Sequence, residues 1–528
     1  MANCSVGVPD CQFADPGEAC ANYYGLYTSV QSSEWLLVLA FLIMAVMAFY
    51  IGANDVANAF GTSVGSKAIS VKWACILGGL ANWLGAVTLG YGVSDTIQTA
   101  ISDVRDPECW ACSYCNSQMD VFGIGMFAAL IGASIFMLLA TFTAMPVSTT
   151  HAIIGGVMGV TIFSVGGGCL NWDFVNGLSG IFATWLISPI LSGVIGILIY
   201  LATNYTIMSS KNPSRNAILS LPILYGVCTF MVVLMILLQS QATKHDLERG
   251  YMVLISVIAM LVVGILVHIL LVPEVKKRMP SVTGKALFEA HDFDDKYDSD
   301  DPALMQTPYD EENCREGSDL RVRRTSSSSI VSETDAELIK EHKRLSPDQL
   351  DAMSVFRYLL VMVATLESFA HGANDTANST GPVSAIYNVY DKGLDSCDTR
   401  ETPVWIMAVA GFFVCVGILV QGHLVMKTIG SRISVMDMHR GFAMEFSSTV
   451  TVVISTLLKL PVSTTHCQVG SVLLVSLVSI GWRNVSFPMM GKIVASWCIT
   501  LPFAGFVGVL LTMIFRSSII AYDRLIFQ

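Results

Sequence analysis

Charge is what this sequence has least of. Only 13% of its 528 residues are Asp, Glu, Lys or Arg, and 53% are hydrophobic, whereas a soluble domain carries about 25% charged residues. The apolar residues also fall in long runs that contain no charge, such as residues 35–51. A large soluble all-helical protein cannot bury that much apolar surface, so this class of protein is excluded.

Long apolar runs recur throughout both halves of the chain. A helix needs about 20 apolar residues to cross a bilayer. We therefore expect an all-α polytopic membrane protein with about twelve transmembrane helices, re-entrant hairpins included. The runs lie near residues 35–51, 73–92, 121–145, 178–203, 217–239, 251–273, 355–370, 403–425, 443–458, 468–482 and 493–515.

The charge that is present gathers in one segment. Residues Glu274–Asp351 carry nineteen acidic and twelve basic side chains, and such a segment buries too little apolar area to fold. Cytoplasmic loops are enriched in Lys and Arg, and these residues flank the segment, so we expect it inside the cell. The predicted order is an extracellular N-terminal segment at 1–34, a first membrane half at 35–273, a disordered cytoplasmic linker at 274–353, a second membrane half at 354–515 and a tail at 516–528.

Six of the fourteen cysteines lie in two segments that we expect outside the cell, the N-terminal segment and the acidic loop at Val93–Asp120. They are Cys4, Cys11, Cys20, Cys109, Cys112 and Cys115. The C-x-x-C-x-x-C run of the last three can be read as a metal site. An oxidising compartment favours disulfides instead, and we expect disulfides for these six. We expect the remaining cysteines to be scattered in helices as small packing residues.

The chain contains an internal repeat of two motifs in the same order. The sequence GANDVAN at Gly52–Asn58 recurs as GANDTAN at Gly372–Asn378, and PVSTTH occurs unchanged at Pro146–His151 and Pro461–His466. By this interpretation seven membrane segments precede the linker, one more than the six apolar runs given above, so the second copy enters the membrane in the opposite sense. We therefore expect two inverted-topology repeats, which in transporters place the substrate at the midplane between the copies.

The first motif points to cation binding. Each copy carries an Asp inside or beside an apolar run, Asp55 and Asp375, and an intramembrane carboxylate is functional by default because it is costly to insert. An Asn follows three residues later on the same helical face. Gly52, Gly61, Gly372 and Gly381 flank the motifs. Together with Pro382 they predict a helix break that frees backbone carbonyls, and carboxylate, amide and carbonyl oxygens are the ligands of hard cations. The competing interpretation is a packing Asp capped by neighbouring backbone, which would have to occur twice.

The second motif points to anion binding. Pro is well tolerated in the first helical turn and Ser and Thr cap helices, so a helix beginning at PVSTTH aims free N–H groups and hydroxyls at one point. Such a helix N-terminus binds anions without a fixed cation, and small residues after the motif suit a re-entrant hairpin that lines a polar cavity. The alternative is ordinary Ser/Thr bonding to backbone inside a packed helix. For His151 and His466 we expect structural hydrogen bonding rather than proton transfer.

Bringing the two motifs into one site gives coupled transport a physical cause. A phosphate near two Asp carboxylates is repelled strongly at low effective dielectric. Cations bound between them turn that repulsion into attraction. Anion and cation then bind together or scarcely at all, as a symporter requires.

These motifs resemble those of the inorganic phosphate transporter (PiT) family of sodium- or proton-coupled phosphate symporters, over roughly residues 35–275 and 354–515. The resemblance implies a multi-pass homodimer of the plasma membrane that imports phosphate. It implies no enzyme activity, no nucleic-acid partner and no cofactor beyond the co-transported sodium ion or proton. Phosphate contact is implied for Ser148, Thr149, Thr150, Ser463, Thr464 and Thr465. Cation contact is implied for Asn54, Asp55, Asn58, Asn374, Asp375, Asn378 and Glu445.

One position departs from the family pattern. Sodium-coupled animal members have an acid where Asn82 stands, which leaves the number and identity of the coupled cations open. We expect sodium coupling, with a proton-coupled phosphate carrier and a sulfate carrier of the same family as alternatives. An anion channel would line its pore with Lys or Arg, and a membrane enzyme would need an activated nucleophile or metal cluster, which these motifs do not supply.

Overall fold

The computed structural model describes residues 34–90, 93–94, 97–98, 100–106, 108–112, 118–174, 177–239, 247–279, 344–392, 402–458 and 462–515. Within these ranges the protein is built of helices, eight of which are long and apolar enough to cross a membrane. Two shorter apolar helices, α7 (Thr149–Ser164) and α20 (Thr464–Ser479), begin within the PVSTTH motifs. The expected N-terminal segment up to residue 33, linker residues 280–343 and the C-terminal tail lie outside the described residues.

Most long helices of the two halves follow the expected apolar runs, whereas α16 (Ala377–Lys392) lies between two of them. The first half contains α3 (Glu34–Gly65), α4 (Val71–Leu89), α6 (Met119–Phe142), α7, α8 (Leu178–Thr203), α9 (Pro213–Gln239), α11 (Arg249–Leu266) and α12 (Val272–Arg278). The second half contains α15 (Pro347–Asp375), α16 (Ala377–Lys392), α17 (Val404–Gln421), α18 (His423–Lys427), α19 (Met438–Leu457), α20 and α21 (Phe487–Phe515). Short π-helical turns lie at Asn204–Met208, Val267–Leu271 and Thr428–Arg432.

The second half begins earlier than residue 354, because a capping box starts α15 at Pro347. The Ser346 hydroxyl accepts a hydrogen bond from the Gln349 backbone N–H at 3.3 Å, and the Gln349 side chain accepts one from the Ser346 N–H at 3.0 Å. Reciprocal bonds of this kind satisfy two donors that a helix start leaves free. At the other end of the linker, helical structure continues past residue 273 as far as Arg278.

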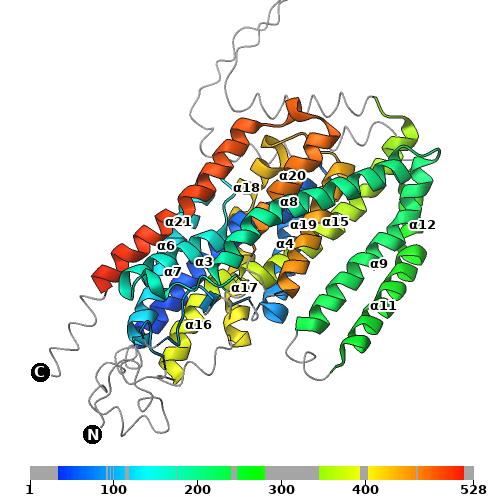
Figure 1. Cartoon of the computed structure of the whole chain (residues 1–528). Helices are drawn as coiled ribbons and strands as arrows, with labels where there is room; N and C mark the ends of the chain where they lie inside the picture. Colours follow the sequence, from blue (N-terminus) through cyan, green and yellow to red (C-terminus); the bar gives the residue numbers. More distant parts are fainter. Residues whose placement is uncertain are drawn as a thin grey trace, which may run out of the picture.

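Corresponding helices of the two halves make reciprocal contacts. Helix α7 packs against α21 and α20 packs against α8, while α3 packs against α17 and α15 against α4. Equivalent turns follow α7 and α20, with positive φ at Gly166 and Gly481. The motif helices of each half are therefore enclosed by helices of the other half, and the two halves cannot be separated into independent bundles (Figure 1).

The glycines around the Asp motifs pack helices together, and the predicted helix break is wrong for the first copy. Helix α3 runs unbroken through its motif, and in the second copy only Thr376 separates α15 from α16. A Cβ atom on Gly52 would lie 2.1 Å from the Val414 carbonyl oxygen, and one on Gly372 would lie 1.9 Å from that of Asn82. Backbone meets backbone at both places, and small residues permit this approach between membrane helices.

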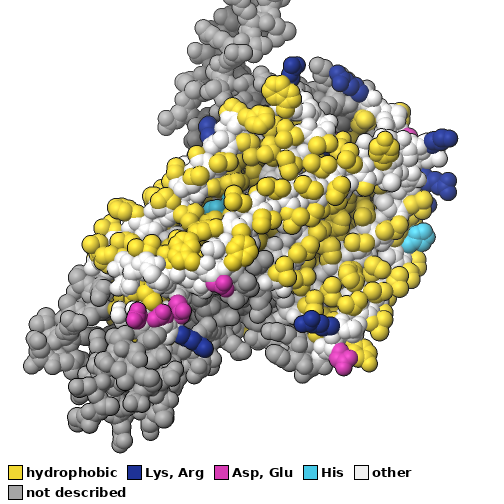
Figure 2. All heavy atoms as spheres, in the orientation of Figure 1, with side chains coloured by type: hydrophobic (Ala, Val, Ile, Leu, Met, Phe, Trp, Pro, Cys, Tyr) yellow, Lys and Arg dark blue, Asp and Glu magenta, His cyan; other side chains and the backbone are white. Residues whose placement is uncertain are grey.

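Apolar side chains cover a broad band of the outer surface, and many charged side chains lie toward its ends (Figure 2). Helices α9 and α11 lie side by side at one edge of the bundle (Figure 1). On α11, Ile258, Leu261 and Ile265 are each more than half exposed. A soluble monomer rarely exposes so large an apolar patch, so this band is the surface that lipid covers.

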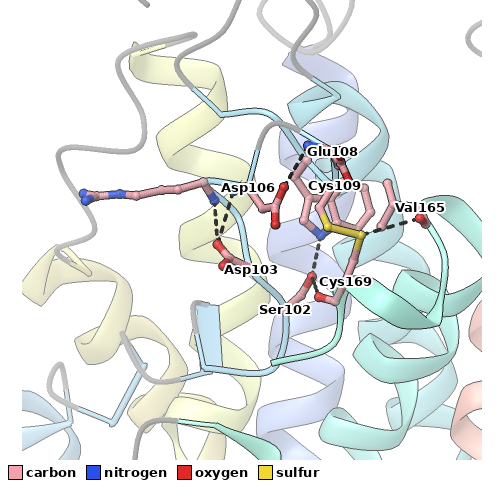
Figure 3. Close-up of a disulfide and its surroundings, with 9 residues drawn as sticks. Ser102, Asp103, Asp106, Glu108, Cys109, Val165 and Cys169 are labelled. Carbon is pink, nitrogen blue, oxygen red and sulfur yellow. Dashed lines mark hydrogen bonds between the residues drawn. A yellow bond between two sulfur atoms is a disulfide. The ribbon is translucent and has the colours of Figure 1, made fainter. Parts of the chain in front are cut away.

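A disulfide joins Cys109, in the loop before α6, to Cys169, in the turn after α7 (Figure 3). The expectation that Cys169 is a packing residue is wrong. The antiparallel bridge between Ser102 and Leu170 brings the turn that holds Cys169 against the loop that holds Cys109. The Trp110 indole N–H donates to the Ser102 hydroxyl at 2.5 Å. Cys112 is also disulfide-bonded. Cys4, Cys11, Cys20 and Cys115 lie outside the described residues.

The close packing of α17 on α3 predicts that a larger residue at Gly417 destabilises the protein. A Cβ added at Gly417 would lie 1.9 Å from the Phe49 carbonyl oxygen of α3. Gly417→Val should destabilise the α3–α17 pair by about 1–3 kcal/mol, as overpacking does. The matched control is Gly491→Val on α21, where nothing lies within 4 Å of the added Cβ. Thermal unfolding of the two purified variants decides the matter. Equal midpoints would contradict this account of α3–α17 packing.

Candidate functional site

The two short helices begin at buried serines. The Ser148 hydroxyl caps α7 by accepting a hydrogen bond from the His151 backbone N–H at 3.2 Å, and Ser463 caps α20 in the same way through His466, also at 3.2 Å. A hydroxyl that accepts at a cap keeps its own proton to donate. The predicted caps are present, but Pro146 precedes the cap rather than occupying the first turn, because the first helical residue is Thr149. Pro461 lies outside the described residues.

The starts of α7 and α20 face each other. The Thr150 hydroxyl donates to the Val462 carbonyl at 3.4 Å, and the Thr465 hydroxyl donates to the Val147 carbonyl at 3.0 Å. The six Ser and Thr residues predicted to bind phosphate are therefore gathered in one place, and each is at most 2% exposed. Two helix N-termini, each with a partial positive charge, meet at this point.

The Asn residues of the Asp motifs reach across to the opposite copy. The Asn58 amide donates to the Thr465 hydroxyl at 2.9 Å, and the Asn378 amide donates to the Thr149 hydroxyl at 3.0 Å. The Thr464 hydroxyl donates to Asp375 Oδ2 at 3.0 Å. The structure thus brings the two motifs of both copies into one buried cluster.

Two further amides brace the two hairpins, which are formed by α6 with α7 and by α19 with α20. Asn54 donates to the Met145 carbonyl at 3.0 Å and accepts from the Val147 N–H at 3.2 Å, so it holds the turn between α6 and α7. Asn374 donates to the Thr456 hydroxyl at 3.4 Å. In this arrangement the Asn54 oxygen already accepts a backbone donor, which fits a positioning role better than the cation contact expected for it.

Several oxygens at this cluster have no hydrogen-bond donor among the described residues. They are Asp55 Oδ2, Asn58 Oδ1 and Asp375 Oδ1. All three side chains are buried, and Asp55 and Asp375 lie close enough to repel each other. Buried acceptors are rarely left without a donor, and an uncompensated buried charge is strongly destabilising. Carboxylate and amide oxygens fit a small hard cation, and the hydroxyls at two helix starts fit an anion.

Glu445 belongs to a second carboxylate cluster. It accepts a hydrogen bond from Thr62 and lies beside Glu367. Glu367 accepts from the Ser448 hydroxyl at 2.5 Å and lies 3.4 Å from His371 Nε2. Both glutamates are fully buried. The sequence interpretation missed Glu367, although it stands in an apolar run and the rule for intramembrane carboxylates applies to it as well.

Asn82 lies on α4 against the second Asp motif. Its side chain is buried, and its backbone carbonyl oxygen is the atom that a Cβ on Gly372 would meet. The position where animal relatives are expected to carry an acid is therefore close to the α15 segment that ends at Asp375.

A buried polar cluster enclosed by lipid-facing helices is the arrangement of a multi-pass membrane transporter. The family model described as phosphate transporter family matches residues 51–508. The chain is 27% identical to the phosphate-repressible phosphate permease pho-4 of Neurospora crassa, over 90% of this chain and 96% of that protein. It is 25% identical to the sodium-dependent phosphate transporter 1-A of Danio rerio, over 94% and 97% of the two chains.

A solved structure titled the sodium-dependent phosphate transporter has the same fold. The TM-score is 0.70 at 27% identity, covering 91% of this chain and 99% of that one. The chain belongs to the phosphate transporter family, so the resemblance drawn from the motifs is confirmed. It is a multi-pass integral membrane phosphate transporter and not an enzyme.

Proposed function

We propose that this chain imports inorganic phosphate by symport with sodium. The observation that carries the proposal is the set of buried carboxylate and amide oxygens without donors beside two helix starts rich in hydroxyls. Cations on those oxygens would cancel the repulsion between Asp55 and Asp375. Only then would a dianionic phosphate find a favourable field at the same place, because charges this close interact strongly in a low-dielectric site.

We assign the groups of the site as follows. Phosphate is held between α7 and α20 by Ser148, Thr149, Thr150, Ser463, Thr464 and Thr465. Cations are held by Asp55, Asn58, Asn374, Asp375 and Asn378, while Asn54 positions the first hairpin. Glu445 and Glu367 provide a further cation site, since two adjacent buried carboxylates need a compensating positive charge or a proton.

The overall architecture we propose is an inverted repeat. Reciprocal packing of α7 on α21 and α20 on α8 supports two equivalent copies, and the odd number of membrane segments expected before the linker gives the second copy the opposite sense in the membrane. About twelve crossings or re-entrant segments then place the linker between α12 and α15 in the cytoplasm. Two such chains form a homodimer in the plasma membrane.

The coupling ion is tested by uptake of labelled phosphate into vesicles containing the purified protein. A sodium gradient and a pH gradient are imposed separately, with unlabelled sulfate added as competitor. Sodium-driven uptake that sulfate does not inhibit is the expected result. Uptake driven by the pH gradient alone would establish the proton-coupled alternative. Inhibition of phosphate uptake by sulfate would support a sulfate carrier.

The first prediction concerns the two carboxylates. Asp55→Asn and Asp375→Asn each keep the size of the side chain and remove its negative charge. Each should abolish gradient-driven uptake, because the cation that neutralises the site loses its main ligand. Surface labelling in cells checks that the variants reach the membrane. Near-normal uptake by either well-expressed variant would contradict the two-carboxylate site.

The second prediction separates phosphate contact from helix capping at Ser148 and Ser463. Ser→Ala and Ser→Gly both remove the hydroxyl, but Gly is a tolerable cap that costs only a few tenths of a kcal/mol. A hydrogen bond to a charged group contributes about 1.5–3 kcal/mol, so all four variants should raise the phosphate KM about tenfold or more. A normal KM in the glycine variants would show that the serines serve as caps only.

The third prediction concerns Asn82. Its amide can contact a cation but cannot supply the negative charge of an acid. Asn82→Glu should therefore raise the apparent sodium affinity or steepen the sodium dependence of uptake, with Asn82→Gln as a control of equal size. Sodium titrations of the wild type and both variants measure the effect. A well-expressed glutamate variant with an unchanged sodium curve would exclude this position from cation coupling.

A further inference from the structure

Four aromatic rings from four different helices meet beside the Ser and Thr residues of the site. The His151 and His466 rings lie edge to face with their centroids 4.5 Å apart. His151 packs on Trp185 at 3.7 Å and His466 packs on Trp497 at 3.8 Å. These rings belong to α7, α8, α20 and α21. We call them the aromatic quartet.

Each tryptophan of the quartet contacts both hairpins. The ring of Trp185 packs on His151, and its backbone carbonyl lies 3.1 Å from His466 Nδ1 and can accept a hydrogen bond from it. Trp497 packs its ring on His466, and its backbone lies beside His151. Helices α8 and α21 are therefore each tied to both α7 and α20.

Apart from the contact of His466 Nδ1 with the Trp185 carbonyl, the rings of the quartet contact one another through their faces and edges. Among the described residues, both ring nitrogens of His151, Nε2 of His466 and the indole nitrogens of Trp185 and Trp497 have no hydrogen-bond partner. His151 and His466 are both buried. Stacking and edge contacts between aromatic rings have preferred geometries, which fix their relative positions.

We propose that His151 and His466 are positioning residues for phosphate, and that the aromatic quartet sets the spacing between the two helix starts. His151 directly follows Thr150 and His466 directly follows Thr465, so any movement of a ring moves the neighbouring hydroxyl. The bonds from Thr150 to Val462 and from Thr465 to Val147 lie at the same junction. This inference rests on the proposed phosphate contact of the Ser and Thr residues.

A double-mutant cycle on the phosphate KM tests the proposal. His151→Ala and His466→Ala should each raise KM about tenfold, and the double variant should raise it by clearly less than the product of the two changes, because either change alone already removes the ring contact that both share. Fold-changes that multiply in the double variant would overturn the proposal. KM is measured in vesicles, since a change that only lowers the amount of folded protein reduces the maximal rate and leaves KM unchanged.

Ring replacement keeps the test decisive if an alanine variant does not fold. His151→Phe keeps a flat ring, so its KM should stay within about twofold of the wild-type value. His466→Phe also keeps a flat ring but loses the bond to the Trp185 carbonyl. Its KM should therefore rise about fivefold, which corresponds to the loss of one hydrogen bond. Trp185→Leu should raise KM, while the matched change Trp482→Leu at an exposed position should not. If His151→Gln preserved KM and His151→Phe did not, the ring nitrogens would be what matters and the proposal would fail.

The same data distinguish this inference from the proposed function. A normal KM in Ser148→Gly and Ser463→Gly would remove the phosphate contacts on which both depend. A raised KM in those variants, together with independent effects at His151 and His466, would leave the phosphate site intact and overturn the positioning role alone.

Discussion

The site depends on two hydrogen bonds that cross between the copies of the repeat, from Asn58 to Thr465 and from Asn378 to Thr149. Each Asp motif is thereby fastened to the hairpin of the other half, so the cation side and the anion side of the cluster cannot move independently. The interlocked helices serve this contact. Glycines bring α3 against α17 and α15 against α4 at backbone distance, which holds the two Asp motifs within reach of the opposite hairpins.

Electrostatics explains why the cluster consists of oxygen donors and helix ends. Partial positive charges at two helix starts favour an anion, but they do not offset two full carboxylate charges. In the proposed symport, mobile cations would supply the missing charge and would leave again with phosphate. A fixed Lys or Arg in the same place would form a permanent ion pair with Asp55 or Asp375 and would remove the dependence of anion binding on the cation.

Much of the fold and the site could be predicted from sequence, because both motifs carry their chemistry locally. Apolar runs predicted most of the helices, and the Ser residues of both PVSTTH motifs cap helices as expected. Features that depend on contacts between distant segments could not be predicted in this way. The glycines near Asp55 and Asp375 resemble helix breakers until the carbonyl they approach is known. Cys169 resembles a packing residue until Ser102 and Leu170 bring its turn against Cys109.

The second carboxylate cluster breaks the equivalence of the two copies. Counted from the Asp of its motif, Glu367 stands where the first copy has the buried Met47. Such a difference cannot by itself drive phosphate in one direction, because direction is set by the ion gradients. Suppose a cation binds the Glu367–Glu445 pair more tightly in the outward-open than in the inward-open state, or the reverse. It would then shift the equilibrium between the two states only by the difference between its two binding free energies. Under the proposed function the asymmetry would therefore act on which face the empty or loaded carrier presents, while the symmetric cluster at Asp55 and Asp375 would couple the cation to the anion.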